Sequence, residues 1–148
     1  MSRNYKFHNP EGIYFVSFAT VYWISVFLRE VYVNIMLDNL KFYQKEKGLN
    51  LYAYCIMPNH VHIIFQSAHN KPSELLRDFK KISARKILKA IKENPQESRK
   101  EWMTWMFQHA ANKDTRKSMH KFWQYHNKPI ELWSNKVVDQ KLDYIHNN

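Results

Sequence analysis

The sequence predicts an α+β fold in which an antiparallel sheet carries two helices on one face. Aromatic and β-branched runs typical of strands are separated by longer segments with helical periodicity. These elements follow in the order strand, helix, strand, strand, helix, strand, and a further helix closes the chain. This order is the split βαβ, or ferredoxin-like, plan.

The first strand is expected over residues 13–21, where aromatic and β-branched residues follow the turn at residues 10–12. A helix over residues 28–47 comes next, and Gly48 is a stop signal. Its apolar residues share one stripe, and charged residues lie on the other side. The stripe consists of Leu28, Tyr32, Ile35, Met36, Leu40 and Tyr43.

Residues 54–65 predict a hairpin of two strands joined at Pro58 and Asn59. Because strand side chains alternate between faces, His60 and His62 point the same way and Val61 points into a core. Two imidazoles on one face can bind a divalent cation. From the pattern alone, a metal pair and two ordinary surface histidines are equally supported.

A second helix is predicted over residues 73–94, ending before Pro95. One side of it is apolar, and the opposite side is almost purely cationic. We call this side the basic stripe; its proposed nucleic-acid-binding residues are Arg77, Lys81, Arg85 and Lys89. A solvated charged face is the plain alternative, but acidic residues do not interleave the stripe, so we favour contact with phosphates.

The last third of the chain gives weaker signals. Aromatic residues between positions 96 and 120 indicate a short helix or packed excursion, and we favour a small hydrophobic cluster over base stacking. Short strands are expected at residues 122–124 and 130–133. A last helix begins after Ser134 or Asn135, with Val138, Leu142 and Ile145 as its apolar stripe.

Tyr144 and Asn148 are four residues apart in this last helix and therefore share a face beside the apolar stripe. A tyrosine in that position either packs half-buried, which is its usual role, or presents its hydroxyl to a site. The sheet face that carries His60 and His62 is free in the predicted plan, and the closing helix is expected near it.

The length and composition predict one domain over residues 1–148. The net charge of +10 favours binding to nucleic acid over binding to an anionic membrane. No apolar run is long enough for a bilayer, and the first residues lack the apolar segment of a secretory signal. The single cysteine, Cys55, is expected to fill core space rather than act as a nucleophile. A reducing, cytoplasmic location is therefore expected.

Two sequence blocks carry a resemblance to a known family. The hairpin block Tyr-Cys-Ile-Met-Pro-Asn-His-Val-His at residues 54–62 and the block Leu-Asp-Tyr-Ile-His-Asn-Asn at residues 142–148 match in the right order. Together they resemble the single-tyrosine HUH transposases, in particular the REP-associated tyrosine transposase branch. The resemblance covers nearly the whole chain, and the joint motif is far more specific than either half.

The resemblance implies a metal-dependent endonuclease and strand transferase acting on single-stranded or hairpin DNA. It places the nucleophile on Tyr144 and the metal ligands on His60, His62 and Asn148. The implied cofactor is Mg²⁺ or Mn²⁺. The implied reaction forms a 5′-phosphotyrosine and leaves a free 3′-hydroxyl, so a second strand can be joined.

This sequence departs from the family pattern in two places. The family continues beyond the paired asparagines with a proline, whereas this sequence ends at Asn148, as expected of a truncated chain. Residues 96–120 are also longer than in compact members. Relatives are known as monomers and as homodimers, and both states are compatible with this chain. The alternative functions are a non-catalytic DNA- or RNA-binding regulator on the same fold and a metal-dependent hydrolase that uses water.

Overall fold

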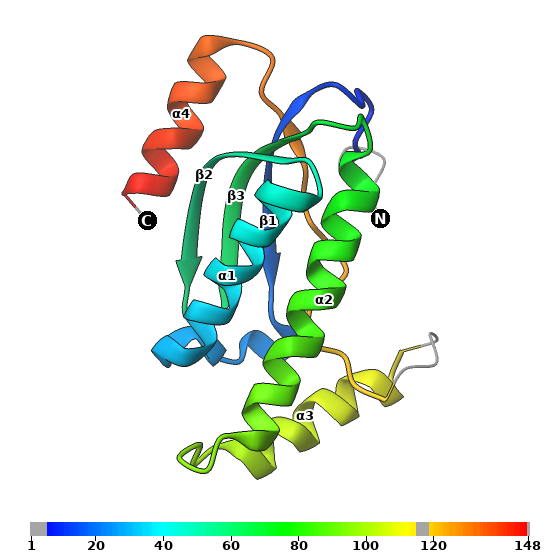
Figure 1. Ribbon diagram of the computed structural model, residues 1–148, viewed down its shortest axis with the longest axis vertical. Helices are drawn as coiled ribbons and strands as arrows, with labels where there is room; N and C mark the ends of the chain where they lie inside the picture. Colours follow the sequence, from blue (N-terminus) through cyan, green and yellow to red (C-terminus); the bar gives the residue numbers. More distant parts are fainter. Residues whose placement is uncertain (1–5, 115–118, 148) are drawn as a thin grey trace.

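The computed structural model describes residues 6–114 and 119–147. Four strands form one antiparallel sheet in the order β2-β3-β1-β4, as the ferredoxin-like plan predicts (Figure 1). The strands are β1 (Ile13–Ala19), β2 (Leu49–Met57), β3 (His60–Ser67) and β4 (Ile130–Glu131). The helices are α1 (Glu30–Glu46), α2 (Pro72–Glu93), α3 (Lys100–Asn112) and α4 (Asn135–His146), and two short 3₁₀ turns, η1 (Val21–Trp23) and η2 (Val26–Leu28), follow β1.

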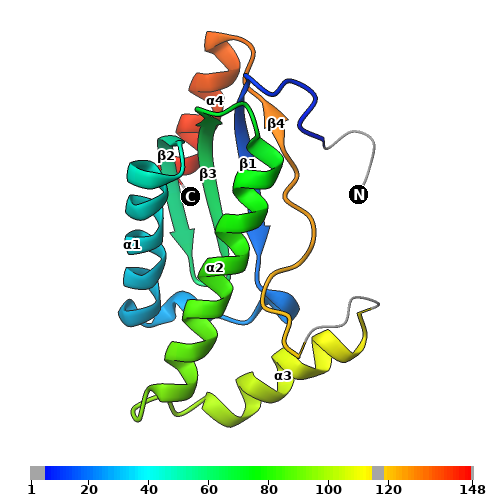
Figure 2. The same ribbon diagram turned by 45° about the vertical axis from the view of Figure 1, so that its right-hand side comes forward.

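The main core lies between one face of the sheet and helices α1 and α2, which run side by side over it (Figure 2). Strand alternation directs Val61, Ile63 and Phe65 of β3 into this core, as predicted. The predicted stripe of α1 meets them through Tyr32, Met36, Leu40 and Tyr43, all buried. Leu28 lies outside α1 and is exposed, because η2 turns the chain before the helix begins.

The opposite face of the sheet carries a smaller cluster under α4. Phe15 and Ile64 of the sheet pack there with Leu132 and with Ile145 of α4. The Ser134 side chain caps this helix by accepting a hydrogen bond from the Val137 amide at 3.3 Å. The predicted start and apolar stripe of the last helix are therefore confirmed, and α4 lies on the face that carries the two histidines.

The strand predicted at residues 122–124 is wrong, because this segment makes only a single bridge, Trp123 with Thr20. The buried Lys80 of α2 explains the departure. Its ammonium donates hydrogen bonds to the Gln124 carbonyl at 3.0 Å and to Asn127 Oδ1 at 2.6 Å. The Gln124 carbonyl is thereby turned toward α2, and the backbone cannot continue as a regular strand.

Helix α3 lies in the part of the sequence where a hydrophobic cluster was favoured, and the structure corrects that expectation in part. Met103 and Phe107 are fully buried in the main core. Trp102 and Trp105, however, are 49% and 58% exposed. The helical period explains the split, since these two residues lie on the side of α3 that faces away from the core.

The start of α3 is anchored by Glu97, whose side chain is completely buried. Its carboxylate accepts hydrogen bonds from Arg29 at 2.9 Å, from the Tyr32 hydroxyl at 2.9 Å and from Arg99 at 3.1 Å. Burial alone would raise the pKa of Glu97, but these donors outweigh it and lower the pKa to about 2. The carboxylate therefore links α1 to α3.

Among the described residues, no helix is long and apolar enough to cross a membrane.

Candidate functional site

His60 and His62 lie on the sheet face under α4, as the alternation of β3 predicts. The register places Ser17 of β1 and Cys55 of β2 directly opposite His62. The two imidazole rings approach each other edge to face, with their centroids 4.8 Å apart. The hairpin thus presents two nitrogen-bearing rings side by side at one end of the sheet.

His62 is 3% exposed, and its Nδ1 atom forms a 2.6 Å hydrogen bond with Ser17 Oγ. Its Nε2 atom is buried without a hydrogen-bond partner among the described residues. Burial, reinforced by the neighbouring His60, lowers the pKa of His62 to about 4. The ring is therefore neutral near pH 7, and it can use a free nitrogen lone pair as a ligand.

Asn59 fixes the orientation of His60. Its Nδ2 donates to the Trp23 carbonyl at 3.3 Å, and its Oδ1 contacts His60 Nδ1 at 2.8 Å. A carbonyl only accepts, so the Asn59 amide nitrogen must face Trp23 and the amide oxygen must face His60. His60 Nδ1 therefore carries the proton, which leaves the Nε2 lone pair free. Burial lowers the pKa of His60, which also favours this neutral form.

Tyr144 extends from α4 toward the histidine pair. Its ring meets the His62 ring edge to face with 5.3 Å between centroids, and it also contacts Phe15 at 5.9 Å. The Tyr144 side chain is 50% exposed, so it is not buried between α4 and the sheet. A cavity of about 420 Å³ lies between these groups. Its walls are formed by Ser17, Phe18, Ala19, Trp23, His60, His62, Gln124, His126, Lys128 and Tyr144.

The side chains at this cavity fit a divalent cation. His60 and His62 each leave one ring nitrogen for a ligand, and the orphaned Nε2 of His62 would gain a partner. Among the described residues, no group of three or more His, Cys, Asp or Glu side chains is arranged to hold a metal ion. A divalent cation held by two imidazoles would still have positions for oxygen ligands. Asn148, the predicted third ligand, lies outside the described residues.

Several cavity residues were not predicted from the sequence. Ser17 and Trp23 become visible only through the strand register and the turn after β1. His126 and Lys128 come from the loop before β4, and Lys128 adds a cation to the wall. Asn59 was already in the hairpin motif, where its place beside two histidines was the available signal.

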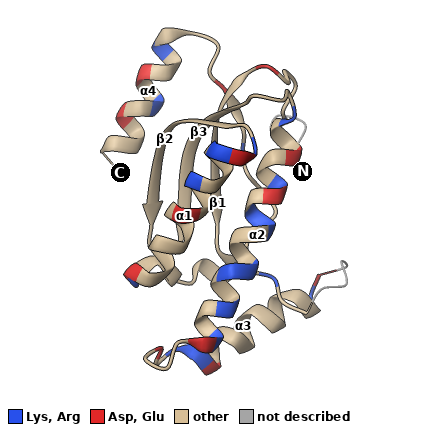
Figure 3. Ribbon diagram, viewed as in Figure 1, with Lys and Arg blue, Asp and Glu red and all other residues tan. Residues whose placement is uncertain are grey.

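The basic stripe lies on the opposite side of the sheet from the histidines, along the exposed side of α2 (Figure 3). Arg77, Lys81 and Arg85 line a groove of about 510 Å³ between α2 and residues 119–127. Lys89 is exposed on the same helix but outside the lining of this groove. Arg77 forms an exposed ion pair with Asp78 at 3.4 Å. Gln124 lines both this groove and the histidine cavity.

The family described as "Transposase IS200 like" matches residues 13–125, which include both histidines and end before Tyr144. Among curated proteins, none matches significantly.

Two solved structures share the fold. One is a REP-associated tyrosine transposase bound to a REP hairpin, with a TM-score of 0.62 and 17% identity over 98% of this chain and 70% of the other. The second is a candidate transposase from Deinococcus radiodurans R1, with a TM-score of 0.56 and 21% identity over 99% of this chain and 95% of the other.

Proposed function

Because this chain belongs to the IS200-like transposase family, we propose that it cleaves and rejoins single-stranded DNA at the cavity between the hairpin and α4. One observation carries the proposal. His60 and His62 from β3 and Tyr144 from α4, far apart in the sequence, line the same cavity. A protein that only binds DNA has no need for this combination of a phenol and two neutral imidazoles.

Tyr144 would act as the nucleophile. Its phenolic oxygen would attack the scissile phosphorus, and the bond from phosphorus to the 3′-oxygen would break. The phenol gives up its proton and the leaving 3′-oxygen gains one, so the products are a 5′-phosphotyrosine and a free 3′-hydroxyl. The half-exposed position of Tyr144 leaves its ring accessible to a DNA strand in the cavity.

His60 and His62 would hold a divalent cation, Mg²⁺ or Mn²⁺, together with Asn148. Such a cation would polarise a non-bridging phosphate oxygen and stabilise the charge that develops as the bond breaks. Asn59 and Ser17 would hold the two rings with their free nitrogens toward the cavity. Lys128 at the cavity wall would attract the phosphate.

Single-stranded or hairpin DNA is the proposed substrate class. The structural relative bound to a REP hairpin supports this choice. The basic stripe of Arg77, Lys81, Arg85 and Lys89 would bind DNA phosphates along α2. Contacts to phosphates give affinity without reading the base sequence.

The decisive test replaces Tyr144 with phenylalanine. Tyr144→Phe removes only the hydroxyl, so we expect no covalent protein–DNA adduct on a denaturing gel and nearly unchanged DNA binding. The measurement uses labelled single-stranded DNA from the gene's own flanks with Mn²⁺. An adduct of unchanged yield would contradict the assignment. A regulator would bind DNA without an adduct in both proteins, and a hydrolase that uses water would still cleave after the substitution.

A second test removes the proposed ligands. The double variant His60→Ala and His62→Ala should lose metal-dependent cleavage, because no imidazole nitrogen remains at the cavity. The assay compares chelator-treated protein before and after addition of Mg²⁺ or Mn²⁺. Full cleavage by the double variant would exclude a metal role for these residues.

A further inference from the structure

The turn after β1 holds two aromatic residues in an unfavourable backbone conformation. Tyr22 and Trp23 have φ angles of 55° and 54°, in the left-handed region that non-glycine residues rarely occupy. Their side chains are nevertheless 43% and 58% exposed. Burial of these rings therefore does not explain the strained turn, and backbone strain of this kind concentrates at functional sites.

The surrounding structure fixes the turn. Thr20 Oγ1 donates to the Ile24 carbonyl at 2.8 Å, and the Trp23 amide donates to the Thr20 carbonyl at 3.2 Å. The Trp23 carbonyl accepts from Asn59, the residue that also orients His60. The same hydrogen-bonded unit thus positions the exposed rings and one of the two imidazoles.

The Tyr22 ring begins a stack that continues onto α3. It lies 6.1 Å from the His109 ring at an interplanar angle of 28°. The His109 ring in turn stacks on Trp105 at 4.8 Å and 9°. Trp105 is 58% exposed, so this three-ring stack is open to solvent. We call Tyr22, Trp23, Trp105 and His109 the aromatic surface.

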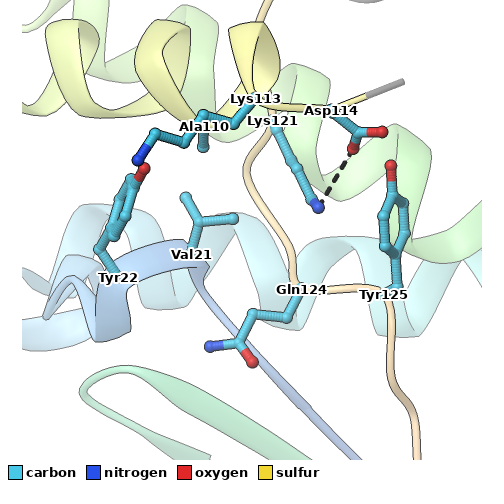
Figure 4. Close-up of a pocket in the computed structure, with 8 residues that line it drawn as sticks. All are labelled: Val21, Tyr22, Ala110, Lys113, Asp114, Lys121, Gln124 and Tyr125. Atoms are coloured by element: carbon cyan, nitrogen blue, oxygen red, sulfur yellow. Dashed lines mark ion pairs between the residues drawn. The ribbon is translucent and has the colours of Figure 1, made fainter. Parts of the chain in front are cut away.

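The aromatic surface is continuous with the proposed cleavage site. Trp23 lines the cavity that holds His60, His62 and Tyr144. Tyr22 lines the adjacent cavity of about 440 Å³, together with Lys113, Lys121 and Tyr125 (Figure 4). Gln124 lines both cavities. A strand that leaves the proposed cleavage site in this direction would meet ring faces and the Lys113 side chain, whereas the Lys121 ammonium is paired with Asp114 at 3.1 Å (Figure 4).

From these observations we infer that the aromatic surface binds single-stranded DNA beside the scissile phosphate by stacking with its bases. The inference rests on the proposed function, which places a DNA strand in the cavity lined by Trp23. Only unpaired bases expose their faces to protein rings, so a duplex would not use this surface. The net charge of +10 and Lys113 in this cavity complement the DNA backbone.

The test distinguishes binding through the DNA bases from binding through the phosphates. Binding of a fluorescent single-stranded thymidine oligonucleotide is compared with binding of an abasic oligonucleotide of equal length, both in the Tyr144→Phe background. Tyr22→Asn removes a ring while keeping a residue type that tolerates a positive φ, and Trp105→Ala removes the outer ring of the stack. Each should weaken binding of the thymidine strand about tenfold and leave abasic binding unchanged.

Two control variants test whether the loss of binding is specific to rings of the aromatic surface. Trp133→Ala removes a 77% exposed tryptophan outside the aromatic surface and should leave both affinities unchanged. Trp105→Tyr keeps a ring at this position and should restore most of the affinity for thymidine. Circular dichroism verifies that each variant is folded.

Unchanged thymidine binding in the ring-deleted variants, or an equal loss with the abasic strand, would overturn the inference. The proposed cleavage reaction is tested by a separate measurement, the yield of the covalent DNA adduct formed by the protein with Tyr144 intact. If binding depends on the bases but no adduct forms, the result would support base stacking on the aromatic surface and contradict the cleavage reaction.

Discussion

At the scale of single residues, Asn59 joins two parts of the candidate site. Its side chain contacts both His60 and the backbone of Trp23. Partners of this kind orient metal-binding imidazoles and fix the tautomer that binds. The hairpin turn therefore holds an orienting group directly beside the ring that it orients.

We predict that Asn59→Ala weakens Mn²⁺ binding about tenfold, because the His60 ring loses the acceptor that fixes its Nδ1 proton. Titration calorimetry with the purified protein measures this directly. Asn50→Ala, at an exposed asparagine of β2, is the matched control and should bind Mn²⁺ like the parent. Equal affinity of the Asn59 variant and the parent would show that the contact does not orient the ring.

The sequence predicts individual site residues when one element determines their direction. Alternation along β3 was sufficient to place His60 and His62 on one face. Ser17 could not be found in this way, because its contact with His62 depends on the register between β1 and β3. Tyr22 and Trp23 could not be identified from the sequence either, since no glycine marks their left-handed turn.

At the scale of elements, the buried carboxylate of Glu97 connects helix α1 to the start of α3. Arg29 precedes α1, Arg99 precedes α3, and both donate to the same side chain. Arg99 also donates to the Ser25 carbonyl at 2.8 Å, which ties in the chain before α1. Helix α3, and with it Trp105, depends on this junction.

We predict that Glu97→Gln lowers the free energy of unfolding by about 3 kcal/mol at pH 7, since two arginines lose their buried partner. Asp78→Asn, in an exposed ion pair with Arg77, is the matched control and should cost less than about 1 kcal/mol. Urea unfolding monitored by circular dichroism measures both. Similar small losses in the two variants would contradict the structural role of Glu97.

This stabilisation should depend on pH in a defined window. The pKa of Glu97 is lowered from its ordinary 4.5 to about 2 in the folded protein, so the unfolded chain takes up the proton first. The contribution is complete above about pH 4.5 and is lost as the pH falls toward 2. The stability difference between parent and Glu97→Gln should shrink over that range.

Elements were predictable where a local period was strong. The apolar stripes of α1 and α2 and the alternation of the hairpin each identify one element without further information. The segment at residues 122–124 has strand-forming residues, yet Lys80 of a distant helix redirects its backbone. A long-range contact of this kind leaves no trace in the local pattern.

At the scale of the whole molecule, the excess of positive charge should determine how DNA affinity responds to salt. A formal charge of +10 spread over a small domain attracts any polyanion. Only those cations that contact phosphates release counterions on binding, however. The salt dependence therefore distinguishes the basic stripe from charge elsewhere.

We predict that replacing Lys81 and Arg85 by glutamine lowers the slope of log affinity against log salt by about 1.4, or about 0.7 for each lost phosphate contact. Lys41→Gln with Lys45→Gln removes the same charge from exposed positions of α1 and should leave the slope nearly unchanged. Fluorescence anisotropy with single-stranded DNA at several salt concentrations provides the slopes. Equal decreases in both double variants would assign binding to net charge alone.

The position of Cys55 gives the molecule a built-in reporter. This residue is the single cysteine of the sequence, and it lies partly buried in the small cluster beneath α4, opposite His62. Residues of α4 pack in the same cluster, so an alkylating reagent would reach the thiol more readily if this helix lifted from the sheet. Labelling kinetics, recorded with and without DNA, would therefore report whether α4 lifts from the sheet, without any engineered probe.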